Sequence, residues 1–492
     1  MKSNIVDTFN NNTILITGST GFLGKLLMEK LLRTCPGITN IVVIIRSKKN
    51  SSADNRVLEM CKGTVFDRLR KENPDFMSKI KVFNGDLQNP LLNLSQNNLN
   101  WIVTNVNFIF HCAATLKFDE LIKKATQINV EGTEQLLNIA TQIKNLKGFI
   151  HVSTAYSHCP RQEIDEEFYP MEITTEDLKL HVKNSNKEIE IQKFWPNTYT
   201  FTKAITENLV KTYSERLPVG IFRPSIVGST FKEPIPGYLE NMNGPSGVVA
   251  GTTVGFLRAI PCKLNNVVDI VPADYTVNAL ITSMWDTANR YQNSVPKKPK
   301  IYNYVSSTFS PLTWKHYISE TKQIYYTAPP NCAIWYEFTY TYDNKWLGKF
   351  VWLFLHWIPG IIFDCMLLLV GKSMRFCKMY TKANKMMKAL GPFSISQWKF
   401  KNKNIQKIWS LLSEEDQKLF FFNMEHFDWS SYIQTFYFGI RNNILHENKH
   451  NIPDALKKHK RLYYLHMFTL FLLTYVFYFL LSTSFGINFF EF

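Results

Sequence analysis

Hydrophobic residues in the first third of the chain fall into short apolar runs separated by longer amphipathic segments. Five runs rich in β-branched and aromatic residues are typical of buried parallel strands, and they cover 14–16, 41–45, 80–84, 106–110 and 148–152. The intervening segments 25–33 and 135–140 place their apolar residues at the spacing of one helix face. This regular alternation of strand and helix predicts an α/β fold with a doubly wound parallel sheet and right-handed crossovers.

The first run leads directly into a glycine-rich turn at 17–24, with the sequence Thr-Gly-Ser-Thr-Gly-Phe-Leu-Gly. Gly18 permits a tight turn, Gly21 lets the backbone approach a pyrophosphate, and Gly24 lets helix and strand pack closely. The N–H groups and the dipole of the following helix favour phosphate. This variant of the dinucleotide fingerprint predicts a Rossmann-type domain whose cofactor contacts Thr17, Gly18, Thr20, Gly21, Phe22, Leu23 and Gly24.

The ends of the later runs carry further candidate cofactor contacts. An NAD enzyme usually has an acidic residue after the second strand, but this chain has Arg46 and Lys48 there. A solvated basic loop is the alternative; behind a glycine turn, these cations favour the 2′-phosphate of NADPH. Ligands of doubly wound sheets lie across the carboxyl edge of the strands. We therefore expect contacts from Asp86 and Leu87, from the small residue Ala113, and from Asn129.

The candidate catalytic residues lie near the fifth run and in a later helical pattern. Tyr199 and Lys203 are four residues apart, so they share a helix face. The Lys203 ammonium is expected to lower the pKa of the Tyr199 phenol and to bind cofactor ribose hydroxyls. Thr154, or its neighbour Ser153, is expected to hold the substrate oxygen that Tyr199 protonates. The alternative is an ordinary amphipathic helix, but the dinucleotide domain favours catalysis.

Composition indicates an anionic or membrane partner and argues against nucleic-acid-binding, disulfide-rich and zinc proteins. Among 492 residues, 45% are apolar and the net charge is +16, which indicates an anionic partner. No nucleic-acid motif is present, so a membrane surface or a phosphate-bearing cofactor is favoured. The 8 cysteines lack a C-x-x-C pair, which predicts neither a disulfide framework nor a zinc site. His446 to His450 matches H-E-x-x-H, but Pro453 and nearby asparagines weaken the helix that this motif needs, so we expect a polar linker and no metal.

Two apolar segments indicate membrane association. Residues 467–485 carry no charge and lie within a transmembrane helix expected over 463–485. Basic residues at 457–461 precede it, so the bulk of the protein, including the catalytic domain, is expected to face the cytosol. The segment 350–370 is interrupted by Pro359 and Asp364, which favours an interfacial or re-entrant helix, or a buried hairpin, over a span. The N-terminus has no apolar signal-peptide region.

These patterns divide the chain into consecutive regions. We expect the NADP-binding domain with substrate-binding elements over 10–280, the rest of the substrate region over 281–350, a membrane-associated segment over 351–379 and a helical domain over 380–446. Smaller expectations are a loop over the glycine-rich run 244–255, either mobile over an acyl channel or a plain surface loop; a surface turn at 297–300; an amphipathic helix over 404–412; and an N-cap at 413–416 for a helix over 417–422. The Phe and Trp residues of the helical domain are most simply core.

In combination, the motifs resemble a known family. The glycine turn, Gly85-Asp-Leu, His151-Val-Ser-Thr-Ala-Tyr, Tyr199-Thr-Phe-Thr-Lys-Ala and Phe222-Arg-Pro-Ser-Ile-Val look like the extended short-chain dehydrogenase/reductases. Within that superfamily, the segments 236–245 and 269–278 and the tail from Tyr380 to Arg441, with Phe427-Asp-Trp inside it, are similar to eukaryotic fatty acyl-CoA reductases. The resemblance covers roughly residues 10–445.

This resemblance implies that two NADPH reduce a long-chain acyl-CoA to a primary alcohol, with CoA released and an aldehyde held between the steps. It also implies that Pro224 and Ile226 pack against the nicotinamide; a buried strand is the alternative, and the two are compatible. The helical domain over 380–446 is assigned no chemistry, although it could cover the acyl chain or form a dimer contact. The implied location is the endoplasmic reticulum, with the peroxisome as the alternative, and a homo-oligomer is compatible with the sequence. Two other readings stay open: a membrane-bound extended reductase acting on hydroxysteroids, which leaves the tail at 380–441 unexplained, and a catalytically silent lipid-binding protein.

Overall fold

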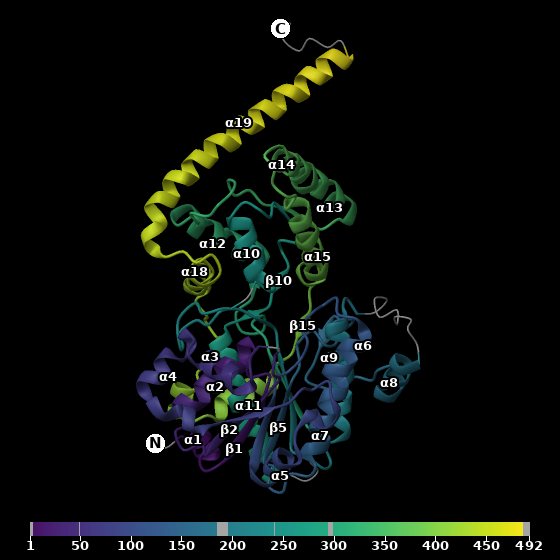
Figure 1. Ribbon diagram of the computed structural model, residues 1–492, viewed down its shortest axis with the longest axis vertical. Helices are drawn as coiled ribbons and strands as arrows, with labels where there is room; N and C mark the ends of the chain where they lie inside the picture. Colours follow the sequence, from purple (N-terminus) through teal and green to yellow (C-terminus); the bar gives the residue numbers. More distant parts are fainter. Residues whose placement is uncertain (1–2, 49, 185–194, 241, 294–298, 486–492) are drawn as a thin grey trace. The chain divides into compact units, whose positions relative to one another are not determined.

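The computed structural model describes residues 3–48, 50–184, 195–240, 242–293 and 299–485 (Figure 1). These residues form two compact units that are interleaved along the chain. The sheet unit comprises Met1–Leu239, Asn266–Thr313 and Pro392–Tyr432, and the helical unit comprises Glu240–Asn265, Trp314–Gly391 and Ile433–Phe492.

The sheet unit is built on seven parallel strands in the order β12-β7-β5-β4-β1-β2-β3. All five strands predicted from the apolar runs are present, as β1 to β5, and the doubly wound fold is confirmed. The order reverses between β1 and β4, which is the point where ligands bind in such sheets. The strands are β1 (Thr13–Thr17), β2 (Asn40–Ile45), β3 (Ile80–Asn84), β4 (Val106–His111), β5 (Gly148–Val152), β7 (Val219–Pro224) and β12 (Lys300–Tyr304).

Helices cover both faces of this sheet (Figure 1). On one face α2 (Phe22–Thr34) packs beside α11 (Ala273–Asn293), and on the other lie α5 (Gln96–Asn105), α7 (Gly132–Ala140) and α9 (Thr198–Thr212). Alternate strand residues point to opposite faces. Those directed toward α5, α7 and α9 join one large core with Leu99, Leu136, Phe201 and Ile205, and they include Leu15, Val42, Ile109, Phe149 and Ile221.

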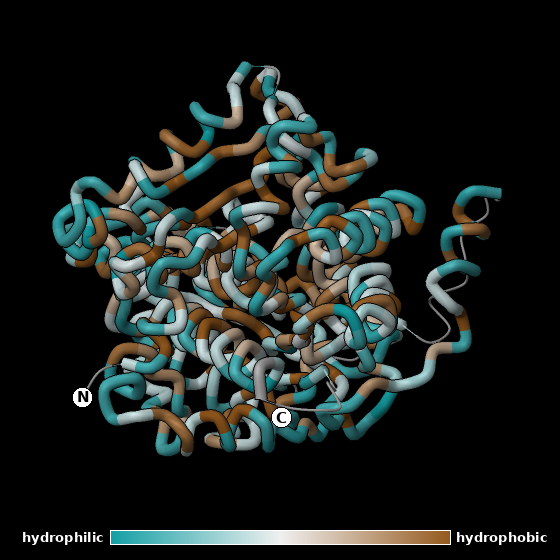
Figure 2. Tube along the Cα trace, turned by 90° about the horizontal axis from the view of Figure 1, so that it is seen from below, coloured by the Kyte–Doolittle hydropathy of each residue, from teal (hydrophilic) through white to brown (hydrophobic). Residues whose placement is uncertain are grey.

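Shorter elements complete the sheet unit. Among them, α8 is amphipathic: Leu178 and Val182 are buried, and Figure 2 shows hydrophobic and hydrophilic positions following one another along this helix at the right edge of the view. The remaining α-helices are α1 (Asn4–Phe9), α3 (Ala53–Cys61), α4 (Asp67–Glu72), α6 (Ile122–Ala125), α8 (Thr175–Asn184), α16 (Lys403–Leu411) and α17 (Glu414–Leu419). Two-residue strands pair as β6 (Glu163–Ile164) with β15 (Lys399–Phe400), β8 (Ile226–Val227) with β11 (Ile270–Val271), and β10 (Val267–Val268) with β13 (Leu312–Thr313).

The helices predicted after residue 400 are present with small shifts. The amphipathic segment expected over 404–412 is α16, Lys403–Leu411. Ser413 is the predicted N-cap, since its hydroxyl accepts a hydrogen bond from the Asp416 N–H at 3.1 Å. The capped helix, however, is Glu414–Leu419 rather than 417–422, because a capped helix begins immediately after its N-cap residue. Residues 297 and 298 of the turn expected at 297–300 lie outside the described residues, and β12 begins at Lys300.

In the helical unit the glycine-rich run is a helix, so the expectation of a loop was wrong. Pro245–Thr253 forms α10, with Pro245 at its first position, where the missing N–H costs no hydrogen bond. Gly247 and Gly251 lie one turn apart and are buried. A Cβ on Gly247 would overlap the carbonyl oxygen of Met242, and one on Gly251 would approach Leu257 at 3.2 Å. These glycines therefore serve close packing of a helix rather than loop mobility.

The rest of the helical unit is mostly α-helical. It contains α12 (Trp314–Thr327), α13 (Lys345–Trp352), α14 (Ile358–Leu369), α19 (Ile452–Phe485), a strand pair of β9 (Ala259–Pro261) with β14 (Tyr340–Tyr342), most of α15 (Phe376–Ile395) and the end of α18 (Trp429–Gly439). Residues 353–357 form a π-helical turn that joins α13 to α14, so Pro359 does not interrupt the helical path. The Asp364 carboxylate accepts hydrogen bonds from the N–H groups of Arg375, Phe376 and Cys377 at 2.8 to 2.9 Å, which ties α14 to the start of α15.

Among the described residues, two helices of this unit are long and apolar enough, by length and composition, to cross a membrane. They are Lys345–Leu369, with 25 residues, and Lys449–Thr483, with 35 residues. Their most apolar windows are 22% and 6% buried, respectively. Because less of it is buried, the second helix is the stronger candidate, and it contains most of the predicted transmembrane segment.

Candidate active site

The glycine turn is shaped by contacts that leave no room for side chains. Gly18 has φ +73°, and a Cβ there would lie 2.7 Å from the Ala113 nitrogen at the end of β4. A Cβ on Gly24 would overlap the Gly18 carbonyl oxygen and approach the Ser19 Cα at 2.8 Å. Gly21 is the N-cap of α2 and is exposed. The first N–H groups of a helix have no intrahelical partners, so this turn presents donors suited to a phosphate.

Side chains around the turn divide between exposed and supporting positions. Thr20, Phe22 and Leu23 are half-buried beside Gly21. Thr17 is fully buried, and its hydroxyl lies 2.7 Å from Nδ1 of His111, whose Nε2 lies 2.8 Å from the Thr133 hydroxyl. Burial lowers the pKa of His111 to about 3, so the imidazole is neutral and bridges β1 and α7. The Thr17 side chain therefore supports the turn from inside the fold.

The second strand ends in the cations expected for NADPH, and an acidic group accompanies them. The Arg46 side chain is 58% exposed and lies 3.3 Å from the Asp86 carboxylate. The backbone N–H of Lys48, an exposed residue, donates to the Ser51 carbonyl at 2.9 Å. The structure thus brings Arg46 and Asp86 together at the end of β2. Leu87 contacts α7, where a Cβ on Gly132 would lie 2.9 Å from the Leu87 carbonyl oxygen.

Lys203 lies between the ends of β4 and β5. Asn197 caps α9 by accepting a hydrogen bond from the Thr200 N–H at 2.9 Å, which places Tyr199 in the first turn and Lys203 in the second. The Lys203 ammonium donates to the Val152 carbonyl at 2.6 Å and interacts electrostatically with the Cys112 thiol. Burial lowers the pKa of Lys203 to about 8. Cys112 is followed by Ala113, the residue that a Cβ on Gly18 would meet, so the end of β4 is shared by the glycine turn and by a group that interacts with Lys203.

The expected lowering of the Tyr199 pKa by Lys203 is not observed. Burial raises the pKa of the Tyr199 phenol well above its ordinary value, because a phenolate loses hydration there. The Lys203 ammonium is directed to the Val152 carbonyl instead. Tyr199 is therefore a protonated phenol at neutral pH, which is the form that donates a hydrogen bond.

The two candidate hydroxyls after β5 have different surroundings. The Ser153 hydroxyl donates to the Glu207 carboxylate at 2.5 Å, so its single proton is committed. The Thr154 hydroxyl accepts a hydrogen bond from the Tyr156 N–H at 3.3 Å, which uses a lone pair and leaves the proton for another acceptor. The geometry thus favours Thr154 over Ser153 as the donor to a substrate oxygen.

Sequence reasoning missed the buried charge cluster around Glu207. Both oxygens of this carboxylate accept bonds from Arg223, at 2.9 and 2.5 Å, and further donors are Ser157 at 2.9 Å and His158 at 3.0 Å. Arg223 also donates to the carbonyl groups of Asp165 and Glu167. These contacts hold the pKa of Glu207 well below its usual range despite burial. The available signal was spacing: Glu207 follows Lys203 by one helical turn.

The remaining predicted cofactor contacts occupy buried or strand-end positions. Asn129 lies in a π-helical turn, Thr126–Glu131, where its side chain accepts from the Thr115 N–H at 2.8 Å and donates to the Thr202 hydroxyl at 2.9 Å. Pro224 ends β7, and Ile226 begins β8. The structure therefore gives Asn129 a partner on α9, three residues after Tyr199.

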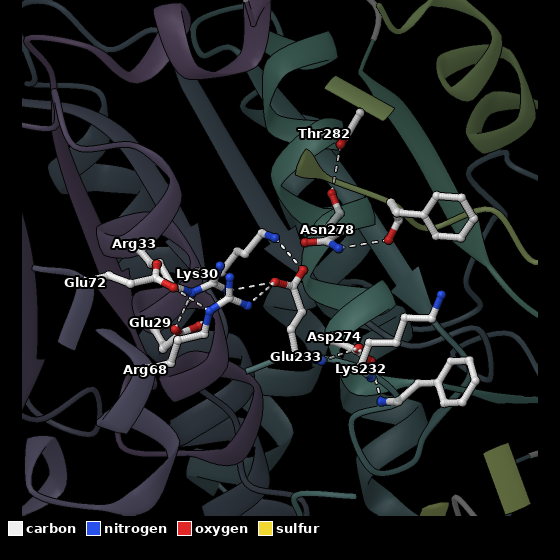
Figure 3. A network of polar contacts seen from close by, with 12 residues as sticks. Glu29, Lys30, Arg33, Arg68, Glu72, Lys232, Glu233, Asp274, Asn278 and Thr282 are labelled. Carbon is white, nitrogen blue, oxygen red and sulfur yellow. Dashed lines mark hydrogen bonds and ion pairs between the residues drawn. The ribbon is translucent and has the colours of Figure 1, made fainter. Parts of the chain in front are cut away.

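The loop after β8 is held against α2 by ion pairs, and its end reaches the glycine turn. Figure 3 shows the Glu233 carboxylate between Lys30 and Arg33 of α2, at 2.5 and 2.8 Å. Asp274, in the first turn of α11, accepts hydrogen bonds from the backbone N–H groups of residues 231–233 at 2.7 to 3.1 Å. The Tyr238 ring, at the end of this loop, stacks on Phe22 with centroids 6.1 Å apart. The loop thus forms a fixed border of the turn.

The H-E-x-x-H residues do not share an α-helix. His446 has a positive φ of 55°, and Lys449–Asn451 forms a short 3-10 helix. Glu447 accepts hydrogen bonds from the N–H groups of Asn331 and Cys332 and from Arg441, at 2.7 to 3.0 Å. Among the residues that the structure describes, no group of three or more His, Cys, Asp or Glu could hold a metal ion.

Comparison with known proteins first defines the class. Family models described as "Male sterility protein" match residues 16–280 and 355–447. The reductase (R) domain of a nonribosomal peptide synthetase from Mycobacterium tuberculosis matches with a TM-score of 0.60 at 17% identity, covering 90% of this chain and 96% of that one. The terminal R domain of the myxalamid pathway matches with a TM-score of 0.57 at 17% identity, covering 89% and 92%. The fold is that of short-chain-type reductase domains.

Curated relatives narrow the class to one family. "Fatty acyl-CoA reductase wat" of Drosophila melanogaster is 36% identical over 470 residues, 94% of this chain and 90% of the relative. "Fatty acyl-CoA reductase 1" of Homo sapiens is 36% identical over 464 residues, 92% and 88% of the two chains. The chain belongs to the fatty acyl-CoA reductase family, as its motifs suggested. It is an oxidoreductase with a nicotinamide-binding domain.

Proposed function

We propose that the protein reduces long-chain acyl-CoA to the primary alcohol with NADPH, releases CoA, and holds the aldehyde between two reductive steps. The observation that carries the proposal is the position of Lys203, whose ammonium donates to the Val152 carbonyl at the end of β5 and interacts electrostatically with Cys112, just after β4. The backbone of Cys112 and Ala113 is what a Cβ on Gly18 would meet, so this strand end adjoins the glycine turn. The proposal also rests on membership of the fatty acyl-CoA reductase family.

The residues around the turn suit NADPH. Gly18 and Gly24 allow the backbone contacts that shape the turn, Gly21 is exposed at the N-terminus of α2, and that N-terminus favours pyrophosphate. The Ser19 hydroxyl is buried without a partner among the described residues. Arg46 is exposed and carries the charge that a 2′-phosphate requires. When bound, NADPH would supply the hydride.

The chain's own groups would manage the oxygen and the protons. The protonated Tyr199 phenol and the Thr154 hydroxyl donate hydrogen bonds to the carbonyl oxygen, where negative charge grows in the transition state. Lys203 binds cofactor ribose hydroxyls and restores the Tyr199 proton. Collapse of the first tetrahedral species breaks the C–S bond and releases CoA thiolate. The same two hydroxyls then stabilise the second alkoxide, which takes a proton from Tyr199 and leaves as the alcohol.

We also propose that α19 anchors the protein. Its apolar part is long enough for a bilayer, and basic residues precede that part, so the catalytic domain would face the cytosol. The endoplasmic reticulum is the proposed membrane, with the peroxisome as the alternative. The helical segment 345–369 exposes Trp346, Phe350, Ile361 and Leu369, which suits contact with the same membrane. The proposed soluble partner is the acyl-CoA substrate.

The direct test combines detergent-solubilised full-length protein with NADPH and acyl-CoAs of increasing length. Loss of NADPH absorbance and the appearance of alcohol by mass spectrometry are expected with long chains. A protein that binds NADPH but turns over no acyl-CoA would overturn the proposal. The Tyr199→Phe variant should lose about 100-fold or more in kcat while binding NADPH normally; retained activity would remove Tyr199 from its role. Replacing Arg46 by Ala should weaken NADPH much more than NADH.

A further inference from the structure

An aromatic cluster in the sheet unit links the two hydroxyls of the proposed site. The Phe118 ring lies 6.0 Å from the Tyr199 ring and 5.6 Å from the Phe393 ring. Phe393 meets Tyr156 edge to face at 5.0 Å, and the Tyr156 N–H donates to the Thr154 hydroxyl. Phe393 therefore lies between the ring that contacts Tyr199 and the ring that follows Thr154.

The two outer rings of the cluster are fixed from the protein side. The Thr198 hydroxyl, next to Tyr199 on α9, donates to the carbonyl groups of Phe118 and Glu120 at 3.2 and 3.1 Å. Trp398 donates its indole N–H to the Cys159 carbonyl at 2.9 Å, and β15 pairs with β6 just after it. A ring wall held by hydrogen bonds at both ends is preorganised to receive a ligand.

Exposure identifies the open side of the wall. Tyr156 and Phe400 are buried within the cluster, whereas Phe118, Phe393 and Trp398 are only half-buried. Beyond Phe118 the same loop exposes Leu116 by 60% and Leu121 by 63%. Apolar side chains thus extend from the proposed catalytic hydroxyls to Phe118, and Leu116 and Leu121 are exposed on the same loop, where Lys117, Asp119 and Glu120 separate them from the ring.

We propose that Phe118 and Phe393 form the wall against which the first methylene groups of the acyl chain lie. The inference rests on the proposed function and says where the apolar acyl chain of its substrate lies. The rings and leucines offer no acceptor or donor for the amides of the pantetheine arm, whose burial without hydrogen bonds is unfavourable. An alkyl chain loses only water there. Phe393 belongs to the C-terminal helical region, whose aromatic residues the sequence suggested are most simply core, with a cover for the acyl chain as one alternative.

Two substrates distinguish the acyl chain from the CoA arm. Hexadecanal has the alkyl chain but no CoA, so a wall that contacts the chain affects the aldehyde and palmitoyl-CoA alike. The Phe393→Ala variant should lose about tenfold or more in kcat/KM with both substrates, while the NADPH dissociation constant is unchanged. Loss with palmitoyl-CoA alone would assign the wall to the CoA arm, and no loss with either would make it core; both outcomes overturn the proposal.

Controls separate this inference from folding and from the proposed function. Phe421 is 39% exposed in the same unit and contacts Tyr275 and Trp409 instead, so Phe421→Ala should leave both rates unchanged. If Phe393→Ala does not fold, Phe118→Leu tests the same wall with a smaller change and should also lower both rates. Wild-type protein that reduces neither substrate would refute the proposed function itself, whereas active wild type with unaffected wall variants would refute only the wall.

Discussion

The glycine turn and the cluster around Glu207 lie in one unit but are constructed differently. The turn is formed by eight consecutive residues. Its tightest point, where a Cβ on Gly24 would overlap the Gly18 carbonyl oxygen, involves positions six residues apart. The cluster joins Ser153 and His158 after β5, Glu207 on α9 and Arg223 on β7, which are far apart in sequence. The turn is a local conformation, whereas the Glu207 cluster depends on the assembled fold.

This difference determines what each region contributes. The turn is a close-packed backbone conformation, so a side-chain atom added at one of its glycines disturbs the turn directly. The cluster fixes the position of residues 153–158 through the buried Glu207 carboxylate, which accepts hydrogen bonds from Ser153, Ser157 and His158. Thr154 lies inside that segment but is not one of these donors. The turn is therefore proposed to bind the cofactor, whereas the cluster positions residues 153–158.

The largest expected effect follows from removing the charge in the cluster. Glu207→Leu leaves the fully buried Arg223 guanidinium without its carboxylate, and breaking a buried pair in this way costs about 3–5 kcal/mol. The melting temperature of detergent-solubilised protein measures this loss of stability. Glu163→Gln is the matched control, because its partner Lys399 is exposed and such surface pairs contribute about 0–1 kcal/mol. Equal melting temperatures for the two variants would show that the buried pair does not hold the fold.

The same contrast explains what could be predicted from the sequence. The five strands and the turn depend on apolar runs and glycine spacing, which are local, and they were predicted at nearly their observed positions. Tyr199 and Lys203 were recognisable from helical spacing. Glu207 and Arg223 were not, because which carboxylate meets a buried arginine depends on strand order. The helix at Pro245–Thr253 was missed because glycines that permit close packing look like glycines of a loop.

A methyl group at Gly24 should have the next largest effect, and it tests the turn. The overlap is with backbone atoms of residues 18 and 19, which cannot rotate away, so Gly24→Ala should destabilise the cofactor-free protein by about 3 kcal/mol. At Gly21, φ is −83° and the nearest atom to an added Cβ is 3.2 Å away, so Gly21→Ala should cost less than about 1 kcal/mol. Thermal unfolding without NADPH compares the two. Similar losses at both glycines would contradict a turn shaped by Gly24.

Ser153 and Thr154 should respond in opposite ways, because only Ser153 donates to the cluster. Ser153→Ala removes one of four residues that donate to Glu207 and should cost about 1.5 kcal/mol, with kcat nearly unchanged. Thr154→Val should retain stability and lose about 100-fold in kcat, since a hydrogen bond to the developing oxyanion disappears. Melting temperature and single-turnover rate separate the two. A large loss of kcat in Ser153→Ala, together with a normal kcat in Thr154→Val, would make Ser153 the donor to the substrate oxygen instead.

The smallest expected effect is a pH dependence carried by Lys203, which lies between the two regions. Its pKa of about 8 in the folded protein is below the value of about 10.4 expected for an unfolded chain. Between these values the unfolded chain binds more protons, so the stability contributed at this position rises with pH, by up to about 1 kcal/mol from pH 8 to pH 9. Melting temperatures of wild type and Lys203→Met, measured across that range without NADPH, should diverge in favour of wild type as the pH increases. Parallel curves would mean that the ammonium keeps an ordinary pKa, and that its hydrogen bond to the Val152 carbonyl compensates for its burial at the end of β5.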